Sequence, residues 1–206
     1  MSMAVFLAQA ILISLSGALS PGPMTAVTIG KGSESPHAGA FIAVGHGIVE
    51  FPLMIAIFFG IAPFLTLPTV KALIALLGGA MLVVMGIGMA RSAGSAEMQE
   101  ATYGRSPIVA GILLAAANPY FIVWWATVGA ALIVTAADYG AWAFVIFMLL
   151  HWCCDFAWYY FLSFMSYRGG RVFGGRFIRI LTGVCGVLLV VFGAKFAWDG
   201  IAMLWV

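Results

Sequence analysis

Long apolar stretches alternate with short polar ones along the whole chain. Six windows are apolar enough to cross the hydrocarbon core of a bilayer as helices, which takes about 20 residues. They lie at about 3–30, 39–65, 70–90, 107–135, 140–166 and 178–198. The connections between them are polar or rich in Gly and Pro, as is typical of turns. The pattern predicts an all-α integral membrane protein with six transmembrane helices.

Composition supports the same fold class. Of the 206 residues, 64% are hydrophobic and only 8% are charged, which is too few to cover a water-soluble surface. A membrane β-barrel would show shorter segments of alternating polarity. The apolar N-terminal stretch has no basic start, so we interpret it as a retained helix and not as a signal peptide. No connection is long enough for a second domain, so residues 1–206 are expected to form a single transmembrane domain.

Basic residues are concentrated in alternate connections. Those after the first, third and fifth predicted helices hold seven of them, whereas the opposite side holds about two. By the positive-inside rule, the odd-numbered connections face the cytoplasm and both termini lie outside. We therefore expect a multi-pass protein of the cytoplasmic (plasma) membrane, in contact with membrane lipid. The seven are Lys31, Arg91, Arg105, Arg168, Arg171, Arg176 and Arg179, and the two are Lys71 and Lys195.

The two halves of the chain carry the same landmarks in the same order. The second predicted helix contains HGIVEF (46–51) and the fifth contains HWCCDF (151–156). The third contains GAMLVVMG (79–86) and the sixth GVLLVVFG (186–193). These matches predict two three-helix repeats, 1–100 and 105–206. Because each repeat has an odd number of spans, the second is inverted in the membrane, as in many secondary transporters.

Proline and glycine interrupt the first and fourth predicted helices near their centres, at Ser20–Pro23 and at Asn118–Pro119. Inside a membrane, the unpaired backbone groups of such breaks are tolerated only within the protein or beside a cavity. The N–H groups freed near Met24 and Phe121 suit an anion such as a carboxylate. The breaks therefore predict a substrate site. Its predicted backbone-break residues are Ser20, Pro21, Gly22, Pro23, Met24, Asn118, Pro119 and Tyr120.

Two carboxylates, Glu50 and Asp155, lie deep in apolar helices, where charge is costly and normally faces an interior cavity. Each follows a histidine by one helical turn, His46 in the first half and His151 in the second. Both carboxylates are predicted to bind substrate. Burial also disfavours the ionised form of an acid, so the four residues are candidates for proton coupling.

Two other interpretations of these four residues are open. Two imidazoles and two carboxylates can ligate a metal ion, with Cys154 as a softer ligand nearby. Alternatively, each histidine only bonds the carboxylate on its own helix. Neither a His-Glu-x-x-His nor a Gly-x-Ser-x-Gly motif occurs in the chain, so we expect no enzyme activity. No cofactor and no nucleic-acid partner are expected.

Glycine and tryptophan give further expectations. The glycines at 79, 86, 186 and 193 recur every seven residues, which favours close helix packing within the chain or in a homodimer. Tryptophans in membrane helices normally face lipid or its interface. Trp124 and Trp125 follow the fourth-helix break closely enough to line a cavity instead.

The broken-helix motifs resemble those of a known family. LSPGPMTAV (19–27) is similar to the PGP signature near the N-terminus of the lysine-exporter (LysE/RhtB) family, which usually has Asn where Met24 stands. ANPY (117–120) is similar to its second NP motif, commonly followed by Lys where Tyr120 stands. The family's acidic residue in the second helix maps to Glu50. Length and six-span layout agree, so the resemblance covers essentially the whole chain.

The resemblance implies a secondary transporter that exports amino acids or related small metabolites, driven by protons and working by alternating access. The wider superfamily is also associated with exporters of cadmium and other metals. The alternative is therefore a divalent-metal exporter that uses His46, Glu50, His151 and Asp155.

Overall fold

A computed structural model describes residues 2–19, 22–61, 64, 67–92 and 106–204 of the chain. Throughout these residues the regular secondary structure is helical. Ser20 and Pro21 of the first predicted break lie outside the described residues, as do Arg105 and the predicted repeat boundary at 100–105.

The first and fourth predicted spans are both divided. The sequence from the N-terminus forms α1 (Met3–Ala18) and α2 (Pro23–Gly32), followed by α3 (Ala38–Phe58) and α5 (Pro68–Ser92). In the second half, α7 (Pro107–Ala116) ends before Asn118, and α8 (Pro119–Trp124) begins directly after it. The chain then continues through a π-helical turn, η1 (Trp125–Gly129), into α9 (Ala130–Asp138), and ends in α10 (Ala141–Leu204).

Five helical stretches within the described residues are long and apolar enough to cross a membrane. Two shorter apolar helices, Met3–Leu15 and Pro107–Ala116, precede the two breaks. The protein is therefore a multi-pass membrane protein. The first predicted span does not count as one long helix because the chain is interrupted before Pro23. The five stretches are Ala38–Phe58, Pro68–Gly88, Pro119–Asp138, Ala141–Gly169 and Gly186–Leu204.

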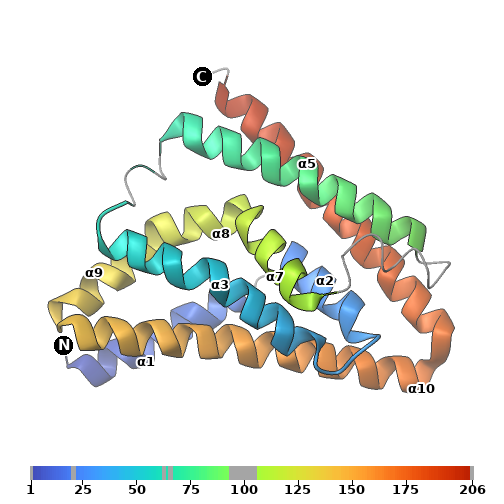
Figure 1. The fold of residues 1–206 in the computed structure, drawn as a ribbon, viewed down its shortest axis with the longest axis horizontal. Coiled ribbons are helices and arrows are strands. Elements are labelled where there is room, and N and C mark those ends of the chain that lie inside the picture. The colour runs from blue at the N-terminus through green and yellow to red at the C-terminus, as the bar shows by residue number, and fades with distance from the viewer. Residues whose placement is uncertain (1, 20–21, 62–63, 65–66, 93–105, 205–206) are drawn as a thin grey trace.

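The last helix differs from the sequence prediction. The fifth and sixth apolar windows predict a connection at 166–179, but α10 is helical over 64 residues. At ~1.5 Å per residue, a straight helix of this length would be far longer than a bilayer is thick. Figure 1 shows α10 turning sharply, so that its second half runs back beside α5. The turn lies near the glycine-rich segment at 166–179, and glycines are common at sharp helix kinks. The predicted loop is wrong, but the sharp turn still divides α10 into two helical halves that run in opposite directions.

Glycines hold α5 against the second half of α10. A Cβ atom on Gly79 would lie 2.7 Å from the backbone oxygen of Gly193, and one on Gly86 would lie 2.6 Å from that of Gly186. Only glycine permits so close a backbone approach, as in other small-residue helix interfaces. The glycine stripes are therefore occupied within the chain and give no separate reason to expect a homodimer.

A leucine in this interface tests the packing. We expect Gly79→Leu to force the two helices apart and to destabilise the protein by about 1–3 kcal/mol, the usual cost of overpacking. Ala80→Leu is the matched control, because Ala80 is the next residue of α5 and is exposed. Thermal unfolding in detergent measures both. Equal melting temperatures for the two variants would contradict the glycine-mediated packing.

Candidate functional site

A cavity of about 420 Å³ lies where the two helix breaks meet α3 and α10. It brings together most of the residues predicted from sequence. Pro119 is buried but packs toward Gly78 of α5 and does not line the cavity. Predicted residues that line it are Gly22, Pro23, Met24, His46, Glu50, Asn118, Tyr120, His151 and Asp155.

The two breaks present different backbone ends to this cavity. Pro23 occupies the first turn of α2, where its missing N–H costs no hydrogen bond, and the N-cap residue is Gly22, which has no side chain to cap the helix. At the second break, the Asn118 side-chain oxygen accepts a hydrogen bond from the Tyr120 N–H at 3.1 Å. The N-terminus of α8 is thus capped by an asparagine side chain, whereas the N-cap residue of α2 is a glycine.

The four ionisable residues form one cluster, which we call the quartet. His46 Nε2 lies 3.1 Å from Glu50 Oε1 and 3.5 Å from Asp155 Oδ2. His151 Nε2 lies 3.2 Å and 3.5 Å from the same two oxygens. None of the four residues is more than 5% exposed. The nitrogens and oxygens alternate around a closed ring, so the quartet is not two independent pairs.

Several quartet atoms have no hydrogen-bond partner in the described part of the chain. They are the second oxygen of Glu50, Nδ1 of His46 and Oδ2 of Asp155, which lies within ion-pair distance of both histidines but makes no hydrogen bond to either. An unsatisfied buried polar atom is costly, so most such atoms in proteins are paired with protein or water. These residues line the cavity, where a ligand or water can supply the missing bonds.

His151 is held in one orientation by Ser14 of α1. The Ser14 hydroxyl donates its proton to the Ala10 carbonyl at 2.7 Å, so it accepts from His151 Nδ1–H at 2.8 Å. A neutral His151 would then point a lone pair at two carboxylate oxygens, which repels unless a proton lies between them. The quartet therefore needs bound protons, held on an imidazole or on a carboxylate.

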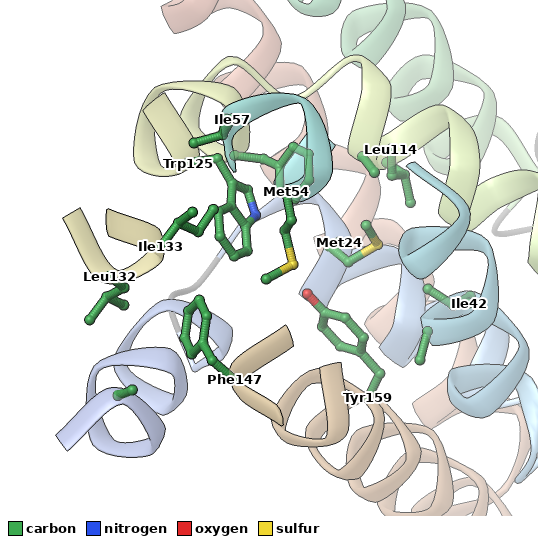
Figure 2. Close-up of a cluster of buried hydrophobic side chains, with 14 of the residues drawn as sticks. Met24, Ile42, Met54, Ile57, Leu114, Trp125, Leu132, Ile133, Phe147 and Tyr159 are labelled. Atoms are coloured by element: carbon green, nitrogen blue, oxygen red, sulfur yellow. The ribbon is translucent and has the colours of Figure 1, made fainter. Parts of the chain in front are cut away.

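Trp125 completes the surroundings of Glu50. Its indole Nε1–H donates to Glu50 Oε1 at 3.3 Å, and its side chain is 1% exposed. It begins η1, and π-helical turns are frequent at functional sites. In Figure 2, which draws the buried hydrophobic side chains, the Trp125 nitrogen and the Tyr159 hydroxyl both point toward the middle of that hydrophobic cluster.

Trp124 and Trp125 both line the cavity, although lipid contact is the default expectation for a membrane tryptophan. Their position shortly after the break at Pro119 is the signal that indicated this alternative in the sequence. Other lining residues that sequence reasoning did not single out are Thr25, Tyr159, Phe192, Lys195 and Phe196.

A metal ion has a partial ligand set here. One ligand atom each from His46, Glu50 and Asp155 lie within 4.8 Å of one another. That set contains neither His151 nor Cys154. Its atoms also face one another as ion pairs, so a metal would have to displace the protons that join them.

The sequence matches one protein family over most of its length. The family model of the LysE type translocators covers residues 15–200. The chain belongs to the LysE type translocator family. Glu50, which maps to the family's acidic residue, lines the cavity, and so do Met24 and Tyr120, the two positions at which this chain departs from the family motifs.

Two relatives match this LysE-type chain over nearly their full lengths. One, from Bacillus subtilis (strain 168), carries the name "Putative amino acid efflux protein YcgF"; it is 28% identical over 208 residues, covering 98% of this chain and 99% of the relative. The other is an "Uncharacterized membrane protein" of Haemophilus influenzae (strain ATCC 51907 / DSM 11121 / KW20 / Rd), 22% identical over 203 residues, covering 93% and 95%. No solved structure matches the chain significantly.

The bond between Ser14 and His151 gives a prediction. Ser14→Ala leaves the buried His151 Nδ1–H without its acceptor, so we expect a loss of about 1–3 kcal/mol in the free energy of unfolding. We also expect the ¹⁵N NMR signals of His151 to report a changed tautomer. Ser14→Thr keeps the hydroxyl and should restore both properties.

Thr135→Val is the matched control for Ser14→Ala. The Thr135 hydroxyl makes the same backbone bond, to Ala131 at 2.8 Å, away from the cavity. Unchanged His151 signals in Ser14→Ala would show that Ser14 does not orient the imidazole.

Proposed function

We propose that this protein exports amino acids across the cytoplasmic membrane through the cavity. One observation carries the proposal: the N-terminus of α2 and two buried carboxylates line the same space. The first attracts a negative group and the second a positive group. An amino acid has both, as a carboxylate and an ammonium. Family membership and the relative named for amino acid efflux support this substrate class.

The substrate is proposed to bind with its carboxylate at the start of α2, around Gly22, Pro23 and Met24. Ser20 and Pro21 belong to the same break in the sequence. The ammonium faces the quartet, where the unpartnered oxygens of Glu50 and Asp155 are available as acceptors. Asn118, Pro119 and Tyr120 shape the opposite side through the second break.

Export is proposed to be proton-coupled. The quartet needs protons to balance the negative charges of its two carboxylates, because unbalanced charge is costly in the interior of a membrane protein. A substrate ammonium supplies one positive charge, so its binding permits one proton to leave. Release of substrate then favours proton uptake. His46, Glu50, His151 and Asp155 are therefore proposed as the coupling residues of an alternating-access cycle.

We further propose that the chain comprises two inverted repeats, 1–100 and 105–206. Both histidines precede their carboxylates by four residues, and both members of the pair recur at the same offset, 151 − 46 = 155 − 50 = 105. The glycine contacts of α5 and α10 are reciprocal in the same way. This arrangement fits six membrane crossings with cytoplasmic odd-numbered connections and external termini, as the positive-inside rule predicts.

A divalent-metal exporter is the second candidate, because three quartet residues have atoms close enough to share an ion. The amino acid interpretation is favoured because it also uses the helix break and agrees with the named relative. Calorimetric titration of the purified protein separates the two. We expect heat from amino acids and none from zinc or cadmium, whereas metal binding that disappears in His46→Ala would overturn the amino acid interpretation.

Neutral isosteres of the two carboxylates test the coupling. We expect Glu50→Gln and Asp155→Asn to abolish transport driven by a pH gradient, down to the level of empty vesicles, because the quartet can no longer exchange charge. Uptake of labelled amino acids into inside-out vesicles measures this. Asp138→Asn is the matched control, since Asp138 is exposed at the end of α9. Unchanged pH dependence in both quartet variants would remove these residues from coupling.

A further inference from the structure

We propose that the cavity selects amino acids with one ammonium group and a large apolar side chain, and that Lys195 disfavours basic amino acids. This selectivity rests on the proposed function and specifies its substrate. Three features carry it: the charge balance of the quartet, the aromatic residues around the cavity, and the position of Lys195.

The quartet can exchange a bound proton for a substrate ammonium. It contains two carboxylates and two imidazoles, so two bound protons make it neutral wherever they reside. One ammonium can replace one of these protons without creating net charge. Glu50 and Asp155 are the only acids among the described residues that line the cavity, and both belong to the quartet. A second cationic group on the substrate therefore finds no further carboxylate, and a buried unpaired charge is strongly disfavoured.

The rest of the cavity is largely aromatic. Tyr120, Phe121 and Trp124 come from α8, and Phe192 and Phe196 from the second half of α10. Such surfaces favour an apolar side chain, because its burial removes apolar area from water on both sides. A volume of about 420 Å³ is enough for a single amino acid of the size of leucine or phenylalanine.

Lys195 disfavours substrates that have a cationic side chain. Aromatic rings alone can hold a cation over their faces. Lys195, however, follows Phe192 by three residues and precedes Phe196 by one, and all three line the cavity. Its side chain is 64% exposed, in contrast to the buried quartet, so it lies toward the open side. It pairs with Asp199, which is outside the lining. Because Lys195 lines the cavity and Asp199 does not, a second ammonium directed toward this side is repelled by Lys195, although the pair with Asp199 reduces the repulsion, whereas an apolar group is not repelled.

A binding panel tests the selectivity. Purified wild-type protein in detergent is titrated with leucine, phenylalanine and methionine, and separately with lysine and arginine. We expect the apolar amino acids to bind about tenfold more tightly or better, a typical discrimination for a pocket of this kind. Equal or tighter binding of lysine or arginine overturns the inference but leaves amino acid export intact. If no amino acid binds, the proposed function itself is refuted.

Two variant pairs separate the contributions of charge and aromatic contact. Lys195→Gln should narrow the preference for leucine over lysine by up to about fivefold, the size of an exposed charge interaction. Lys71→Gln, which removes a lysine outside the cavity, should leave the ratio unchanged. An unchanged ratio in Lys195→Gln refutes the role of Lys195.

The second pair removes an aromatic ring. Phe196→Ala should weaken leucine binding about tenfold, whereas Trp198→Ala, which removes an exposed ring from the same helix, should not. If Phe196→Ala fails to fold, Phe192→Ala provides the same comparison from the neighbouring turn. Wild-type leucine affinity in a folded variant that lacks Phe196 or Phe192 refutes the aromatic contact.

Discussion

The mutual neutralisation of four ionisable side chains is the constraint on which the rest of this structure depends. In hydrocarbon, an isolated carboxylate is strongly disfavoured. Glu50 and Asp155 are buried there because His46 and His151 lie within 3.5 Å of both. That ring requires α3 and the first half of α10 to pack closely, and it places the charge beside the two helix breaks. The contact between α3 and α10, the quartet and the two helix breaks therefore lie in the same small region of the protein.

The second organising feature is the close helix pair formed by α5 and the returning half of α10. Interlocked glycines bring their backbones together, and the returning half contributes Phe192, Lys195 and Phe196 to the cavity. The quartet and these three residues thus belong partly to one continuous helix, α10, on either side of its sharp turn. A change in that turn alters the distance between the buried acids and the aromatic residues that face them.

Much of the fold was predictable because apolar length and helix-breaking residues act locally. Pro23, Asn118 and Pro119 locate both interruptions, and the spacing of His46 and Glu50 locates one side of the quartet. The helical turn of α10 was not predictable, since glycines and arginines at 166–179 equally favour a loop. The bond from Trp125 to Glu50 was not predictable for a different reason: it joins residues 75 positions apart, and no periodic pattern reports such a contact. Lys195 was likewise interpreted as a topology signal, because its place in the lining depends on how α10 returns.

Asn118 has a consequence beyond the cap that it provides. Its amide oxygen already accepts a hydrogen bond from the Tyr120 N–H at the start of α8. A molecule in the cavity that is to bond this N–H must first displace the Asn118 side chain. The break in the second half of the chain therefore binds a negative group only in exchange for a hydrogen bond that the protein makes to itself.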